Sequence, residues 1–229
     1  KGHTGVGGEA YGFHKGMITK ALDAGFQLAI HAIGDKANRD VLDLYENYFK
    51  AHPKSKELRH RIEHVQIVHP DDFSRFNKLN LIASMEPAHA VEDMPWAIDR
   101  VGEKRAKGAY AWRTLRNNNV TVIFNSDFTG SDPSFFYGMH SAITKKKKTD
   151  DKQWFPEQAF TKEESLRAYT IWAAYAAKQE HLTGTIEVGK WADVTFMDVD
   201  ILNATPEGIL NGTILKTMIN GNIVYENLP

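Results

Sequence analysis

Four short segments with the length of a strand alternate with longer amphipathic ones, and this alternation limits the folds that the chain can adopt. The short segments cover residues 26–31, 60–65, 79–85 and 120–127, and all but the second are mainly apolar. Repeated strand–helix units indicate a parallel sheet with helical crossovers. We therefore expect an α/β fold, either an open doubly wound sheet or part of a closed barrel.

The amphipathic segments predict the helices. They lie at residues 11–24, 34–50, 95–105, 108–118, 134–143 and 161–178, with a short helix after Pro70. Gly25 is expected to end the first helix, and Asp35 to cap the start of the second. Thr161 and Glu164 form a capping-box pattern, which predicts where the last helix begins.

The pattern changes after residue 184. Two β-rich runs follow, at residues 184–200 and 214–226, and the second contains Asn-Gly-Asn at a tight turn. No helix is expected between them. We therefore divide the chain into an α/β part, residues 1–184, and a β-rich part, residues 185–229.

The charge balance limits the class of partner. The 229 residues include 28 Lys and Arg against 29 Asp and Glu, a formal net charge of −1. A chain without a strong net field is not expected to bind nucleic acid or an anionic membrane. Lys145–Lys148 is the one basic run, and it is interpreted as a solvated loop because no aromatic residues interleave with it.

Cysteine content and hydropathy set further limits. The chain has no cysteine, so a metal site would have to use histidines and carboxylates, and a cytoplasmic location is slightly favoured. No apolar run approaches the ~18 residues of a membrane span. The chain begins with Lys1 rather than Met, so this N-terminus is not expected to be the start of the gene.

Three of the four predicted strands end in a residue that can bind a metal. These residues are His31, His64 and Asp127. In parallel α/β folds the carboxyl ends of the strands form the functional face, so the three side chains are expected to converge there. Taken singly, each could instead be a structural histidine or a loop aspartate. Together they predict a site for a divalent ion such as zinc.

The second strand is unusually polar for a core element. His60 shares the face of His64 by simple alternation, and it is interpreted as a hydrogen-bonded core histidine. Arg61 and Glu63 lie on the other face, where they could pair with each other or with a crossover helix. A buried charge has to be paired in one of these ways because its desolvation is costly.

Several segments resemble a known family. They are GFQLAIHAIGDKAN, LRHRIEHVQ, IASMEPAHA, RAKGAYAWRTL, SDFTGSDP, SLRAYTIWAAYAA and GTIEVGKWADVTFMDVD. They resemble the C-terminal half of the amidohydrolase superfamily, in particular family 3 with its N-substituted formamide deformylases. The resemblance implies strands five to eight of a TIM (β/α)8 barrel, followed by the C-terminal strands of a small β-sandwich.

The resemblance also implies roles for individual residues. His31, His64 and Asp127 match metal-binding positions, and Asp127 matches the residue that also shuttles the proton. Glu86, His89 and Trp112 are the predicted substrate contacts, although for Trp112 packing and ligand contact are equally favoured. Glu86 stands where the family pattern leads us to expect glutamine, a change that could favour cationic substrates or lower affinity.

The implied function is metal-dependent hydrolysis of amide-type, non-peptide C–N bonds in a small-molecule substrate. The family's His-x-His pair and metal-bridging lysine have no counterpart here, since the segment at His3 reads His-Thr-Gly. The chain is therefore expected to be a fragment that is inactive alone. The alternative is a non-catalytic, self-associating half-barrel, of which two copies could close a barrel as a homodimer.

Overall fold

The computed structural model describes residues 13–227, and these form two compact units. Among the described residues, unit 1 contains residues 13–85 and 96–122, and unit 2 contains residues 86–95 and 123–227. His3 and residues 11–12 of the first predicted helix lie outside the described residues. The strands that follow residue 184 belong to unit 2.

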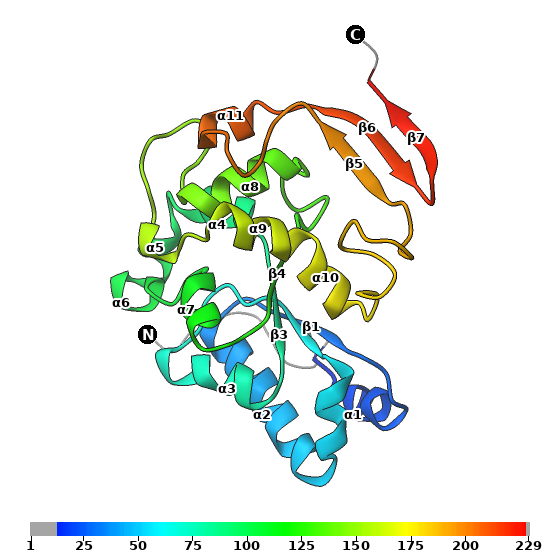
Figure 1. Ribbon diagram of the computed structural model, residues 1–229. Helices are drawn as coiled ribbons and strands as arrows, with labels where there is room; N and C mark the ends of the chain where they lie inside the picture. Colours follow the sequence, from blue (N-terminus) through cyan, green and yellow to red (C-terminus); the bar gives the residue numbers. More distant parts are fainter. Residues whose placement is uncertain (1–12, 228–229) are drawn as a thin grey trace. The chain divides into compact units, whose positions relative to one another are not determined.

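Four strands form a sheet with the order β1-β2-β3-β4 (Figure 1). Its strands are β1 Ala29–Ala32, β2 Arg61–His64, β3 Ile82–Met85 and β4 Val122–Phe124. β1 pairs with β2 and β2 with β3 in parallel, with Ile30 opposite Ile62 and Ile62 opposite Ala83. The predicted α/β class with a parallel sheet is therefore confirmed, and each strand is shorter than predicted.

Unit 1 surrounds its strands with short and medium helices. They are α1 Lys15–Asp23, α2 Asp35–Ala51, α3 Phe73–Lys78, α5 Ala97–Val101, α6 Glu103–Ala106 and α7 Trp112–Asn117, with 3-10 turns at Pro53–Leu58 and Pro70–Asp72. The N-cap of α2 is Gly34 rather than Asp35, which is the first helical residue. The single helix predicted at 95–105 is divided at Gly102, whose φ of +78° interrupts the helical backbone.

The core of unit 1 includes an imidazole. His60 is fully buried, and its ring lies 5.2 Å from the Tyr45 ring and 5.8 Å from the Phe49 ring, both on α2. Its Nδ1 accepts from the backbone N–H of Leu28 at 3.0 Å, and its Nε2 lies 3.2 Å from Ser55 Oγ. The interpretation of His60 as a hydrogen-bonded core histidine is confirmed.

Unit 2 contains a second set of helices. They are α4 Pro87–Asp93, α8 Phe135–Thr144, α9 Lys162–Tyr169, α10 Ile171–Ala176 and α11 Pro206–Leu210, with a 3-10 turn at Pro156–Gln158. The capping box of Thr161 and Glu164 is confirmed at the start of α9. The continuous helix predicted at 161–178 is wrong, because Thr170 leaves the helical region with φ −122° and ψ −96°. Across the described residues no helix is both long and apolar enough to cross a membrane.

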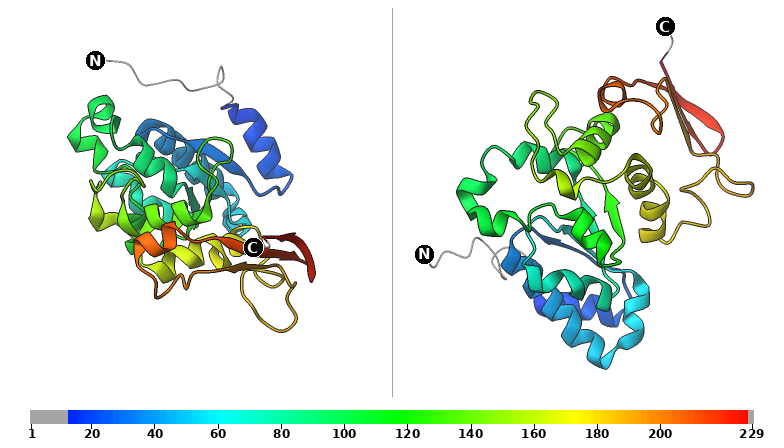
Figure 2. Two further views of the ribbon diagram at one scale, coloured as in Figure 1. Left: turned by 90° about the horizontal axis from the view of Figure 1, so that it is seen from above. Right: turned by 60° about the vertical axis from the view of Figure 1, so that its left-hand side comes forward.

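The C-terminal part of unit 2 forms an antiparallel sheet. Its strands are β5 Val194–Met197, β6 Ile214–Ile219 and β7 Asn222–Glu226. Asn220 and Gly221 both have positive φ, as a tight type I′ hairpin turn requires. The expectation that no helix lies in this part is wrong. α11 packs on α8 (Figure 2). The contact includes Phe136 and Ile209, which belong to one hydrophobic cluster.

Lys145 departs from the solvated loop predicted for the basic run. Its side chain is fully buried, at the left-handed C-cap of α8, and its Nζ lies 5.7 Å from the centre of the Trp154 ring. Burial lowers the pKa of Lys145 to about 7, against the opposing effect of the Glu157 carboxylate. The aromatic partner missing from the run itself is supplied nine residues later in the sequence.

Replacing Lys145 with Met should change the pH dependence of stability. The folded-state pKa lies below the unfolded value, so burial costs most stability below pH 7, and the cost fades as the pH rises toward 10.5. The wild-type free energy of unfolding should therefore rise between these limits relative to Lys145→Met, by up to ~1.4 kcal/mol per pH unit. Urea titrations at several pH values measure the free energy of unfolding of each protein. Lys146→Met, at a partly exposed position, should match the wild-type slope, and equal slopes for all three proteins would contradict the prediction.

Candidate metal centre

His31 and His64 come together at the carboxyl ends of β1 and β2. Their rings are 4.5 Å apart between centroids and inclined by 72°. Simple alternation would place His64 on the face of His60. The backbone at His64 and Val65 instead has φ values of +71° and +46°, which interrupts the regular strand at this point. Unit 1 therefore presents two imidazoles side by side, His31 exposed and His64 nearly buried.

The other polar residues of β2 are paired. Arg61 Nε lies 3.0 Å from Glu63 Oε1, and both side chains are about one quarter exposed. Glu63 is directly opposite His31 in the register of the two strands. The prediction that Arg61 and Glu63 could pair with each other is confirmed, and the pair brings no net charge to the strand beside His31.

Asp127 lies just beyond β4, in unit 2. Its own φ is +48°, and its backbone N–H donates to Oδ1 of Asn125 at 2.8 Å. The Asp127 side chain is exposed. A Cβ added at Gly130 would lie 2.5 Å from Asp127 Oδ2 and 2.9 Å from its carbonyl oxygen. The loop therefore folds back tightly on Asp127, and a residue without a side chain is needed at position 130.

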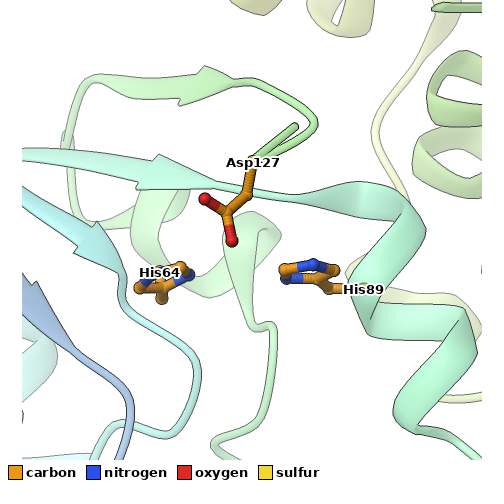
Figure 3. A group of neighbouring side chains, drawn as sticks. All are labelled: His64, His89 and Asp127. Atoms are coloured by element: carbon orange, nitrogen blue, oxygen red, sulfur yellow. The ribbon is translucent and has the colours of Figure 1, made fainter. Parts of the chain in front are cut away.

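His89 brings a second donor close to Asp127. It lies on α4, and each of the two residues offers a ligand atom within 4.8 Å of the other; both are drawn, together with His64, in Figure 3. Glu86 raises the pKa of His89, with smaller contributions from the Gly130 carbonyl and the Asp127 charge, while partial burial opposes the shift. Unit 2 thus contributes an imidazole and a carboxylate.

Two of the predicted substrate contacts are buried. Glu86 is 1% exposed and Trp112, on α7, is fully buried. Glu86 Oε1 accepts from Asn125 Nδ2 at 3.1 Å, and Oε2 lies 3.7 Å from His89 Nδ1. The carboxylate of Glu86 is thus directed at protein groups. The substrate-binding roles of Glu86, His89 and Trp112 stay predictions.

The sequence patterns missed α4 and the role of Asn125. Pro87 at the first helical position is a typical start signal, and it could have identified α4 as a helix carrying His89. Asn125 gave no comparable signal, because an asparagine after a strand is common in loops. Its hydrogen bond to Glu86 joins residues that are 39 positions apart in sequence.

Each unit contains donors of the kinds that a divalent metal binds. Imidazole nitrogens and a carboxylate oxygen are the ligands that zinc uses when no cysteine is present. The rings of His31 and His64 are in contact already, and Asp127 has an accessible carboxylate. The chemistry of the donors therefore agrees with the metal expected from the strand ends.

Comparison with known proteins decides the family. The model of an amidohydrolase family matches residues 4–225, almost the whole chain. The chain belongs to this amidohydrolase family. It is 32% identical over 210 residues to "Protein LONG AFTER FAR-RED 3" of Arabidopsis thaliana and 26% identical over 214 residues to an N-substituted formamide deformylase of Arthrobacter pascens. These matches cover 91% and 92% of the chain.

The chain is also similar to a solved structure. An uncharacterized metal-dependent hydrolase from Pyrococcus horikoshii OT3 superposes with a TM-score of 0.70 and 27% identity, over 84% of this chain and 38% of that one. The chain spans 36% and 38% of the two curated relatives. It thus corresponds to less than two fifths of the length of these family members.

Gly130→Ala should destabilise the amidohydrolase chain by ~1–3 kcal/mol, the usual cost of overpacking. The added methyl group would collide with the Asp127 carbonyl oxygen, which cannot rotate away as a side chain can. Urea unfolding measures the loss. Gly16→Ala, at a helical glycine with nothing within 4 Å, is the control and should be neutral or slightly stabilising. Equal stability of the two variants would show that the loop relaxes freely.

Proposed function

We propose that the protein containing this chain is a metal-dependent amidohydrolase that cleaves amide-type, non-peptide C–N bonds of a small molecule. The observation that carries the proposal is the contact between His31 and His64 at the ends of adjacent parallel strands. Family membership and the metal-dependent structural neighbour support it.

His31, His64 and Asp127 are the proposed metal ligands, and zinc is the proposed ion. A bound divalent ion would act as a Lewis acid and lower the pKa of water toward ~7. The histidines would bind through neutral imidazole nitrogens. Glu63, opposite His31 in the strand register, is paired with Arg61 and so does not compete as a charged ligand.

Asp127 is the proposed catalytic residue. Its carboxylate is exposed and would accept a proton from water during attack on the carbonyl carbon, then deliver it to the departing nitrogen. The hydrogen bond from its backbone N–H to Asn125 holds the start of the loop in place during this transfer. Bringing base and substrate together in a fixed geometry is a large part of such catalysis.

The architecture proposed for the parent protein is a (β/α)8 barrel of which this chain supplies half. The strands β1 to β4, which are neighbours in the sheet in that order, would be strands five to eight, and a closed barrel needs eight. β5, β6 and β7 would be the C-terminal strands of a small β-sandwich. The remaining ligands and the substrate pocket would then depend on chain outside this sequence.

His64→Ala should weaken zinc binding by more than tenfold, because even residues that only orient a ligand are worth ~10–100-fold. Zinc competition titrations on the full-length protein measure the affinity. His69→Ala is the matched control, since the His69 side chain is 44% exposed and its Nδ1 lies 3.5 Å from the exposed Asp71. Unchanged affinity in His64→Ala would exclude it as a ligand.

Asp127→Asn should lower kcat by ~10²–10⁴-fold, the typical contribution of a general acid–base. The amide keeps the shape of the carboxylate but cannot accept the proton. Steady-state kinetics with N-substituted formamides and other small amides, on the full-length protein, measure the change. Far-UV circular dichroism checks that the variant is folded, and a folded variant with wild-type kcat would remove Asp127 from the catalytic step.

One observation favours a second candidate function, a self-associating module. Ile219, Ile223, Val224 and Tyr225, at the end of β6 and on the edge strand β7, are each about half exposed. An edge strand with apolar side chains can pair with another chain, which would include a homodimer of this one. Sedimentation analysis of the chain at several concentrations, with and without zinc, separates the two functions.

A further inference from the structure

A continuous chain of contacts connects His89 to Asp127 inside unit 2. The backbone N–H of Asp127 donates to Asn125 Oδ1 at 2.8 Å, and Asn125 Nδ2 donates to Glu86 Oε1 at 3.1 Å. The other oxygen of Glu86 lies 3.7 Å from His89 Nδ1. The buried carboxylate of Glu86 therefore contacts His89 directly and is connected to Asp127 through Asn125.

The chemistry of these groups fixes their orientation. A carboxylate only accepts hydrogen bonds, so the amide nitrogen of Asn125 must face Glu86. The amide oxygen of Asn125 then faces the N–H of Asp127, which can only donate. The two contacts of Asn125 agree with a single orientation of its side chain.

The same reasoning applies to His89. Its Nδ1 faces an oxygen of Glu86 at a distance typical of an ion pair, somewhat longer than a hydrogen bond. Glu86 is 1% exposed, so this interaction is little weakened by solvent. An imidazole nitrogen that faces a buried carboxylate is stabilised as N–H, whereas a bare lone pair there would be repelled.

We propose that Glu86 is a positioning residue that keeps a hydrogen on Nδ1 of His89 and thereby fixes the orientation of the ring. Through Asn125, the same carboxylate also holds the backbone at Asp127. The assignment of the hydrogen rests on this geometry alone. Its importance for a substrate rests on the proposed hydrolase function.

Glutamine at position 86 would reverse the arrangement without changing its shape. Its oxygen could still accept from Asn125, which leaves its NH₂ group to face Nδ1 of His89. Nδ1 would then have to accept, and the hydrogen would move to Nε2. The identity of residue 86 thus selects the tautomer of His89, although Glu86 itself is buried.

Nitrogen-15 NMR of the histidine rings tests this proposal, because one-bond and two-bond N–H couplings distinguish a protonated from an unprotonated Nδ1. The spectra are recorded on this chain with a chelator present, so neither metal nor turnover is needed. His89→Asn identifies the His89 signals among the ten histidines. We expect a protonated Nδ1 in the wild type and an unprotonated Nδ1 in Glu86→Gln.

Glu92→Gln is the matched control. Glu92 lies on the same helix and accepts from Ser131 Oγ at 3.2 Å, so the same chemical change is made without touching this network. His89 should keep a protonated Nδ1 in this variant. A hydrogen on Nδ1 that persists in Glu86→Gln would overturn the proposal, as would its loss in Glu92→Gln.

The wild-type spectrum is decisive even if Glu86→Gln fails to fold. An unprotonated Nδ1 in the wild type would overturn the proposal outright, and a protonated Nδ1 supports it. A failure of the hydrolase proposal would be seen in zinc affinity and turnover and would leave these spectra unchanged. The two proposals can therefore fail independently.

Discussion

Parallel backbone pairing of β1, β2 and β3 is the interaction on which the candidate site depends. Parallel strands end on the same edge of a sheet, so the last residues of β1 and β2 become neighbours, however far apart they are in sequence. The register sets His31 opposite Glu63 and Ala32 opposite His64. A shift of one residue would turn His31 to the opposite face of the sheet.

The polar groups near the strand ends are compatible with a folded core because nearly every charged side chain there lies beside a polar or oppositely charged partner. Arg61 is paired with Glu63, and Glu86 is directed at Asn125 and His89. His60 uses both ring nitrogens within the core of unit 1. Among the polar residues at the candidate site, His31 and Asp127 have exposed side chains. A ligand can bind only to side chains that it can reach.

The sequence allowed the fold class and the start of α9 to be predicted, because both follow from local periodicity and from a capping pattern within four residues. The sequence also predicted that His31 and His64 lie close together, since the ends of strands can be recognised from local sequence. The break at Thr170 and the burial of Lys145 were missed. Both depend on partners that a local pattern does not contain.

The position of His64 illustrates the same limit within the site. Alternation along the strand assigns His64 to the face of His60, but the positive φ values at residues 64 and 65 are a property of how the strand ends. The predicted neighbour, His31, is confirmed. For Glu86, the departure from the expected glutamine could be noticed in the sequence, whereas its partners required the structure.

The buried Lys145 has a consequence for protein chemistry on this molecule. Amine-directed reagents and lysine-modifying enzymes need access to the ε-amino group, and trypsin needs an accessible side chain beside the bond that it cuts. Four consecutive lysines would ordinarily be treated as equivalent targets. Here the first of them, Lys145, is buried beside Trp154. Labelling of Lys145 would therefore show that the segment after α8 had opened.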